Sequence, residues 1–196
     1  MRILNTAVAA LSALLAVVFT CFGSFSEISD YDVVSGVGVD FEKNQWLVTC
    51  EICMPSADND FGSSSIYVEG KGDTLDSAFE DAGRRSANIL YTGGNQLYII
   101  GENARGKAEL YEYFLKDGVN LRAVAVYSQG RAADTLSAKN GDENSRAKSL
   151  AMSKKVSRFC AEQGLPLPKV TEYLKGGQMI IVSGEETPIK AVANNA

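Results

Sequence analysis

Between residues 72 and 102, the spacing of apolar residues predicts a helix that leads into a buried strand. Small and apolar residues recur every three or four positions and so share one helical face; they are Leu75, Ala78, Phe79, Ala82, Ser86 and Ile89. Thr74 can cap the first turn. Gly93 and Gly94 can end the helix, because glycine readily adopts the positive φ found just past a helix end. The apolar run of residues 97–100 then predicts a strand covered on both faces.

Strands and helices alternate along the rest of the chain. We expect strands over residues 33–41, 45–53, 66–70, 121–127, 170–174 and 179–183, helices over 107–115 and 145–163, and a helical turn over 131–136. Lys43 and Asn44 predict a hairpin turn, and the glycines within residues 33–41 predict close approach by another backbone. The residues after 185 are weakly patterned, and we expect them to fray. This mixture predicts an α+β (mixed α/β) fold, a single domain in which a mixed or antiparallel sheet packs with helices.

An apolar segment precedes this domain. Arg2 is followed by an uncharged stretch over residues 3–22. Three interpretations stay open: a cleaved secretory signal, an uncleaved membrane-spanning helix, or a lipoprotein signal that makes Cys21 the lipidated first residue. Two of the three residues before Cys21 are larger than a lipoprotein signal normally has. All three interpretations place the domain over residues 23–185 outside the cytoplasm, and we expect residues 186–196 to be a flexible tail.

The composition excludes several classes of function. The chain has 22% charged and 45% hydrophobic residues, which is typical of a folded globular protein. Its net charge of −5 disfavours binding to nucleic acid or to an anionic membrane through a basic patch. Histidine is absent, which excludes Ser–His and Cys–His catalysis, histidine metal sites and histidine pH switches. We therefore expect no metal, no cofactor and no catalytic centre.

Cys50 and Cys53 form a C-x-x-C pair, a spacing found in redox and zinc sites. No second pair follows, which disfavours zinc. The surrounding residues predict a strand, on which positions three apart point to opposite faces, so these two thiols are poorly placed to pair. The favoured interpretation is that they are small buried residues, while a disulfide from Cys160 to either of them stays open.

The candidate binding residues lie in loops at strand ends, where function concentrates more often than in the scaffold. They are Asp40, Tyr91, Gly93, Gly94, Gly101 and Glu102. The acidic residues Asp30, Asp32 and Asp40 could in principle supply an acid–base pair. Acidic residues near strand ends are usually solvated, so we expect no such pair. Residues 58–60 resemble the start of a calcium loop but lack its closing glutamate.

Several blocks of the sequence follow one another in the order of a known family. Cys21 is followed by Glu27 and Ile28, then by VVSGVGVD, LYTGGNQLYIIGENAR, YFLKDGVNLRAVAVYSQGRAADTL and the proline pair of residues 166–168. Over residues 20–185 the chain resembles the N-terminal domain of the Ger(x)C lipoproteins, the C subunits of spore germinant receptors. Residues 22–24 depart from the family pattern, and Gly94 stands in place of the family's histidine.

The resemblance implies a lipid-anchored, non-enzymatic subunit outside the inner spore membrane. Such subunits work with the membrane-embedded A- and B-type subunits in nutrient-triggered germination. Family members continue for two more domains, whereas this chain ends near the end of the first. The alternative is therefore a standalone extracytoplasmic binding or structural protein of a spore former. A secreted hydrolase would instead require a deep pocket with converging carboxylates.

Overall fold

The computed structural model describes residue 12 and residues 30–54, 64–138, 148–184 and 188–194. The chain divides into two compact units, Met1–Asp30 and Tyr31–Ala196. Cys21, the calcium-like segment of residues 58–60 and the expected start of the helix at residue 145 lie outside the described residues. Among the helices described, none combines the length and apolar character needed to cross a bilayer.

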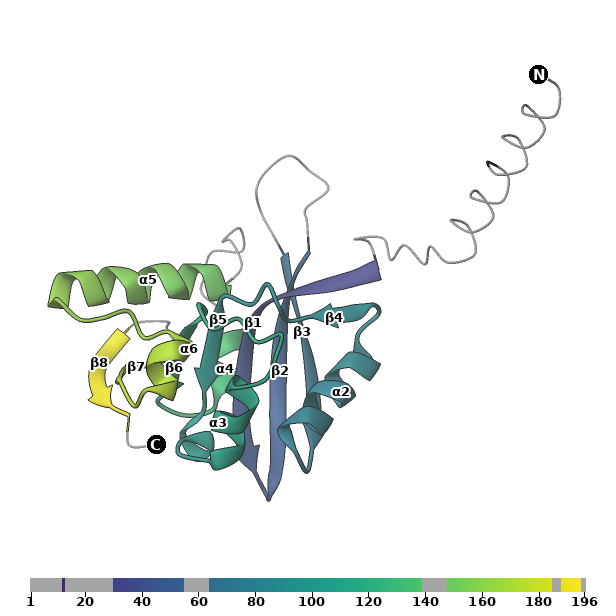
Figure 1. Ribbon diagram of the computed structural model, residues 1–196, viewed down its shortest axis with the longest axis horizontal. Helices are drawn as coiled ribbons and strands as arrows, with labels where there is room; N and C mark the ends of the chain where they lie inside the picture. The colour runs from purple at the N-terminus through teal and green to yellow at the C-terminus, as the bar shows by residue number, and fades with distance from the viewer. Residues whose placement is uncertain (1–11, 13–29, 55–63, 139–147, 185–187, 195–196) are drawn as a thin grey trace. The chain divides into compact units, whose positions relative to one another are not determined.

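The second unit contains strands and helices in alternation (Figure 1). The strands are β1 Tyr31–Glu42, β2 Gln45–Met54, β3 Ser64–Gly72, β4 Ile89–Tyr91, β5 Leu97–Ile100, β6 Val124–Ser128, β7 Gln178–Val182 and β8 Pro188–Ala193. The helices are α2 Leu75–Arg85, α3 Ala108–Phe114, α4 Ala132–Ser137, α5 Lys148–Gln163 and α6 Val170–Leu174, with a 3-10 turn η2 over Glu102–Ala104.

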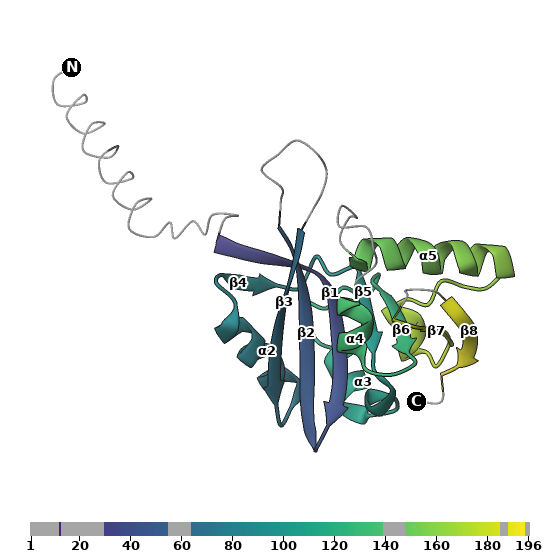
Figure 2. The same ribbon diagram turned by 180° about the vertical axis from the view of Figure 1, so that it is seen from behind.

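Within the described residues, the strands form one eight-stranded sheet of order β3-β2-β1-β5-β6-β7-β8, with β4 paired to the start of β1. The β1–β2, β2–β3 and β7–β8 pairs are antiparallel. The β1–β5, β5–β6 and β6–β7 pairs are parallel. Figure 2 shows the long β1–β2–β3 strands beside the shorter parallel strands. The predicted α+β fold with a mixed sheet is thus confirmed.

Helices cover both faces of the sheet. One core cluster joins the sheet to α2, α3 and α6, and the other joins it to α4 and α5. Tyr98 and Ile100 of β5 belong to the first cluster, while Leu97 and Ile99 belong to the second. Since alternate side chains of a strand point to opposite faces, a fully apolar run must be covered twice. The structure confirms this prediction for β5.

The β1–β2 hairpin was predicted correctly, including its turn. Lys43 and Asn44 have φ of 50° and 63°, the left-handed pair that suits a two-residue hairpin. The interleaved glycines of β1 leave room for α4 and α5 to pack closely on one face of the sheet. A Cβ added at Gly36 would lie 1.7 Å from Ser149 Oγ, and one at Gly38 would lie 3.2 Å from the carbonyl carbon of Ala132. The predicted close approach by another backbone is confirmed at Gly38, whereas Gly36 faces the side chain of Ser149.

The end of α2 was predicted wrongly. The helix stops at Arg85, with Ser86 as its C-cap, and neither Gly93 nor Gly94 has a positive φ. Residues 89–91, which were expected to be helical, form strand β4 parallel to the start of β1. The apolar periodicity continues across this boundary, so side-chain spacing alone did not mark it.

Two further differences lie near the C-terminus. Residues 170–174 were expected to form a strand but form helix α6, whose Val170 and Tyr173 both pack into the first core cluster. Their three-residue spacing fits one helical face. Beyond residue 185, where no strand was expected, β8 pairs antiparallel with β7. The side chain of Asn194 then accepts a hydrogen bond from the Tyr127 hydroxyl and donates one to the Tyr173 carbonyl.

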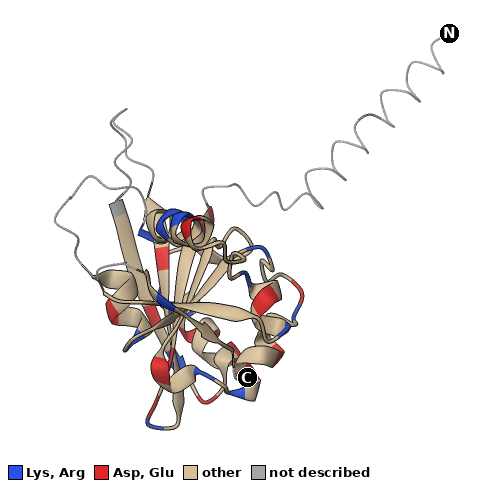
Figure 3. Ribbon diagram, turned by 90° about the vertical axis from the view of Figure 1, so that its left-hand side faces the viewer, with Lys and Arg blue, Asp and Glu red and all other residues tan. Residues whose placement is uncertain are grey.

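Acidic and basic residues are intermingled over the face shown in Figure 3. Several form ion pairs: Arg85 binds Asp81 at 2.8 Å, and Arg131 binds Glu42 at 2.6 Å. These pairs are partly exposed, so each contributes little to stability. The charge on this face is therefore mixed.

Candidate functional site

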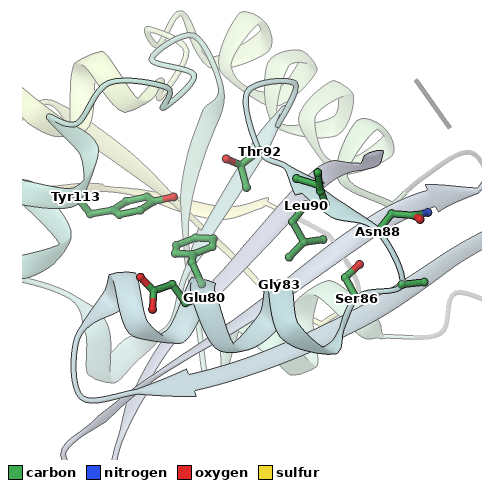
Figure 4. Close-up of a pocket in the computed structure, with 10 residues that line it drawn as sticks. Glu80, Gly83, Ser86, Asn88, Leu90, Thr92 and Tyr113 are labelled. Atoms are coloured by element: carbon green, nitrogen blue, oxygen red, sulfur yellow. The ribbon is translucent and has the colours of Figure 1, made fainter. Parts of the chain in front are cut away.

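A groove of about 580 Å³ lies between α2 and β4. In Figure 4 its residues come from α2 on one side and from β4 with its flanking segments on the other, with Tyr113 at one end. Its lining is mainly apolar, with hydroxyl and amide groups and one acidic side chain: Phe79, Glu80, Gly83, Ser86, Ala87, Asn88, Ile89, Leu90, Thr92 and Tyr113. Grooves of this kind are the usual sites for small ligands or partner side chains.

The buried carboxylate of Asp32 fixes one end of this groove. It accepts a hydrogen bond from the Ser86 hydroxyl, and the backbone and side-chain nitrogens of Asn88 donate to it at 3.3 and 3.1 Å. The bond from Ser86, aided by those from Asn88, holds the pKa of the Asp32 carboxyl below its usual value, although burial opposes this. Asp32 thus anchors the segment that ends α2 and begins β4.

Stacked aromatic rings form the opposite end of the groove. The rings of Phe79 and Tyr113 are parallel within 5°, with centroids 4.9 Å apart. Phe79 reaches this position from α2, and Tyr113 from α3. Burial raises the pKa of Tyr113 and of the neighbouring Tyr98. Both phenols therefore stay neutral, and this end of the groove is apolar.

Three of the predicted binding residues gather beside the groove. Tyr91 is 50% exposed and pairs with Val33 of β1. A Cβ added at Gly93 would lie 2.8 Å from the Tyr91 hydroxyl oxygen, and one at Gly94 would lie 3.6 Å from the same ring. The two glycines therefore give the Tyr91 ring room to lie over the turn. A binding role for these residues stays a prediction.

The other three predicted binding residues meet at the far end of β1. Asp40 was expected to be solvated, but it is only 5% exposed. Its carboxylate caps α4 by accepting the backbone N–H groups of Ala132 at 2.7 Å and Ala133 at 3.0 Å. Burial raises the pKa of Asp40, and these two N–H groups oppose the rise. A Cβ added at Gly101 would lie 1.9 Å from Asp40 Oδ1, so only glycine fits there.

Glu102 lies next to this cap but belongs to a separate pocket. It lines a smaller pocket of about 250 Å³ together with Arg105 and Lys190, and its backbone N–H donates to the Gly130 carbonyl at 3.1 Å. The six predicted residues thus form two groups at opposite ends of β1. Sequence reasoning missed most of the groove, because it treated Phe79 and Ile89 only as apolar positions of a helix.

Sequence reasoning also missed Glu51, a fully buried carboxylate in β2. Its Oε1 accepts the backbone N–H of Lys148 at 2.9 Å and the Ser65 hydroxyl at 2.8 Å. Its Oε2 accepts the backbone N–H of Ser149 at 3.0 Å and the Ser35 hydroxyl at 2.9 Å. Glu51 therefore holds the first turn of α5 against the sheet. The sequence feature that could have indicated this role is an acidic residue inside an otherwise apolar strand.

The cysteines of the described residues are unpaired. Cys50 belongs to the core cluster on one face of the sheet and Cys160 to the cluster on the other, which separates the two thiols. Burial raises the pKa of Cys50 to about 12. The interpretation of the C-x-x-C pair as small buried residues is confirmed for Cys50, whereas Cys53 is only half-buried; Cys160 is buried as well. The alternative, a disulfide from Cys160 to Cys50 or Cys53, is not formed in the structure.

In the described part of the chain, three buried carboxylates serve as acceptors for backbone and hydroxyl donors. Asp32, Asp40 and Glu51 each hold a segment or a helix end against the β1–β2 hairpin. Within the described residues, no group of three or more His, Cys, Asp or Glu side chains is placed to bind a metal. The groove offers apolar surface with polar groups along its rim. This arrangement suits recognition of a partner side chain or small ligand.

The chain therefore forms an α+β domain with a candidate binding groove between α2 and β4. Residues 24–158 match the family model described as the spore germination protein N-terminal domain. The match spans more than half of the chain, and the chain belongs to this family. The resemblance derived from the ordered sequence blocks is thereby confirmed, and the family links the chain to spore germination and germinant receptors. Searches of curated proteins and of solved structures gave no match.

Proposed function

We propose that this chain is a membrane-anchored, non-enzymatic subunit corresponding to the C component of a spore germinant receptor. It contributes to nutrient-triggered germination by assembling with the A- and B-type membrane subunits. The family match over residues 24–158 carries this proposal. Asp32, Asp40 and Glu51 accept backbone N–H groups and hold the fold together, so the proposal gives these carboxylates structural roles.

The proposed location is the extracytoplasmic side of the cell membrane or the inner spore membrane. Either a lipid on Cys21 or the apolar residues 3–22 would hold the chain there. Intact mass of the mature protein from the membrane fraction separates these anchors. Cleavage before Cys21 with an added diacylglyceryl group supports lipidation, and an uncleaved mass supports a membrane helix. A cleaved, unmodified and soluble product contradicts anchoring.

The assembly surface in this proposal is the groove between α2 and β4. Gly83 of α2 lines it, and a Cβ added there meets nothing within 4 Å. A side chain at position 83 would therefore occupy the groove without disturbing the core. Gly130 is a matched control, because a Cβ added there also meets nothing within 4 Å and the residue is not part of the groove lining.

The test is co-purification from spore membranes of the native host. The tagged wild-type chain should recover the A- and B-type subunits after crosslinking, and deletion of its gene should slow the response to nutrients. Gly83→Gln should lower both recovery and germination rate, while Gly130→Gln should preserve them. A deletion strain that germinates normally, with no membrane subunit recovered, contradicts the proposal and supports the standalone extracytoplasmic protein instead.

A further inference from the structure

Four residues at the start of the sheet form a surface that we call the ribbon face: Tyr31 and Val33 of β1, and Ile89 and Tyr91 of β4. Tyr31 pairs with Ile89 and Val33 pairs with Tyr91. Partners in a parallel pair share a face, as do residues two apart along a strand. All four side chains therefore lie on one side of the two-strand ribbon, and the rings of Tyr31 and Tyr91 meet edge to face at 6.3 Å.

The ribbon face is apolar and open to solvent. Val33, Ile89 and Tyr91 are 43%, 58% and 50% exposed. Ile66 is also exposed at this end of the sheet, at 44%, but its row runs through Ile52 to Val34 and so lies on the face opposite Val33. Exposed apolar surface gathered in one place is typical of a protein or membrane contact.

The opposite end of the sheet has a different character. There the β1–β2 turn presents Glu42, Lys43, Asn44 and Gln45, of which the last three are exposed. Gln45 is also hydrogen-bonded to the exposed Asp73. One end of the sheet is thus polar and charged, and the other is apolar.

Basic side chains flank the apolar end. Arg84 and Arg85 close α2, just before the segment that leads into β4, and their side chains are 69% and 51% exposed. Both pair with Asp81 from the same helix. Tyrosine, aliphatic and arginine side chains together are the residues that favour the headgroup region of an anionic bilayer.

The length of chain before β1 restricts which end can reach a membrane. Ten peptide units separate Cys21 from Tyr31, so Tyr31 lies within about 35 Å of an anchor at Cys21 even when the linker is fully extended. The 12 residues of β1 span about 40 Å at roughly 3.3 Å per residue. The linker thus sets an upper limit of about 35 Å between an anchor at Cys21 and the end of the sheet that carries the ribbon face, and the limit for the opposite end is about 40 Å greater.

We propose that the ribbon face contacts the bilayer surface that carries the anchor, with Ile89 and Tyr91 at the headgroup level. This inference rests on the proposed anchor. A face held flat on the membrane would fix the orientation of the domain relative to the bilayer.

The experiment uses the anchored full chain in vesicles of phosphatidylcholine and phosphatidylglycerol that contain brominated acyl chains. Bromine quenches tryptophan, and the single native tryptophan, Trp46, is buried and gives a constant background. Tyr91→Trp reports on the ribbon face. Tyr111→Trp is the matched control, because Tyr111 is also exposed but lies on α3. Quenching at position 91 should exceed that at position 111 by roughly twofold or more.

A second pair of variants tests whether the quenching at position 91 depends on the apolar side chain of Ile89. Adding Ile89→Asp to Tyr91→Trp should lower the quenching to the level of the position 111 reporter, whereas adding Leu115→Asp, at a residue 61% exposed beyond α3, should not. Flotation with the vesicles measures the anchor separately. If the chain does not float with the vesicles, it has no membrane anchor, and the inference that rests on the anchor is overturned as well. A chain that floats with equal quenching at both positions overturns the ribbon-face contact alone. If position 91 becomes buried only when the A- and B-type subunits are present, the ribbon-face contact is also overturned, because that result indicates a contact with protein.

Discussion

The carboxylate of Glu51 accepts the backbone N–H of Ser149 at 3.0 Å, which joins positions 98 residues apart. Glu51 lies in the second strand, and Ser149 in the first turn of α5. Free N–H groups and the helix dipole make a helix N-terminus a favourable place for a negative charge. This contact ties the second half of the chain to the β1–β2 hairpin, which also supplies Asp40 to cap α4.

Glu51→Gln should destabilise the chain by about 3 kcal/mol. The amide would lose the charge and direct an N–H group at donors that are already buried. The measurement is urea unfolding followed by circular dichroism. Glu69→Gln on the exposed side of β3 is the control and should change the free energy of unfolding by less than about 0.5 kcal/mol. Equal effects of the two variants would show that Glu51 does not hold α5.

Asp32 should make the fold sensitive to acid. Its carboxyl has a lower pKa in the folded chain than the ordinary value of 3.8, chiefly because of the bond from Ser86. The unfolded chain therefore takes up the proton first on acidification. The resulting stabilisation is complete above the ordinary pKa and is lost as the pH falls through the folded pKa.

Asp32→Asn should remove this dependence. Its free energy of unfolding should be lower than that of the wild type at neutral pH, and should fall less steeply below about pH 4. Urea titrations at a series of pH values give both slopes. Asp117→Asn, an exposed change beyond α3, should retain the wild-type slope. An unchanged slope in Asp32→Asn would exclude this carboxyl as the source.

Substitution by alanine should change stability in opposite directions at two glycines, one beside α2 and one within it. A Cβ added at Gly70 would lie 2.2 Å from the Ala78 carbonyl oxygen, so α2 would have to move off β3. Gly70→Ala should cost about 2 kcal/mol. Gly83 has an open environment inside the helix, and Gly83→Ala should stabilise the chain by about 0.5–1 kcal/mol. Thermal unfolding of both variants tests the pair, and a neutral Gly70→Ala would contradict the close packing of α2 on β3.

The thiols should differ in their reaction with iodoacetamide. Cys53 is half-buried and should react first, while Cys50 and Cys160 are buried and should be protected in the native chain. The pKa of about 12 for Cys50 leaves very little thiolate near neutral pH. Peptide mapping by mass spectrometry after timed labelling measures the three rates. In urea the rates should converge, and rapid native labelling of Cys50 would contradict its burial.

Patterns that depend on neighbours along the chain were predictable from the sequence. The doubly covered β5, the Lys43–Asn44 turn and the glycines of β1 each follow from local composition. The end of α2 was not predictable in this way. The periodicity continues past Arg85, whereas the boundary is set by Asp32, whose bonds to Ser86 and Asn88 cross more than 50 residues of sequence.

The candidate site likewise contains residues that the local sequence predicted and residues that it did not. Tyr91, Gly93 and Gly94 were predicted to lie in a loop at a strand end. The structure places Tyr91 at the end of β4 and the two glycines in the turn that follows, beside the groove. The roles of Asp40 and Glu51 were hidden, because an acidic residue near a strand end or inside an apolar strand does not indicate which helix will meet it. Likewise, β8 is a strand because β7 offers it an open edge.

The sequence by itself determined the family, the mixed composition of strands and helices, and the positions of the first hairpin and the central buried strand. These features are encoded by residue order and by periodicities of two or three to four residues. Only the tertiary structure decided where α2 ends, that residues 170–174 are helical, and which donors the buried carboxylates accept. Those outcomes depend on hydrogen bonds and packing between residues far apart in the chain, for which local spacing carries no signal.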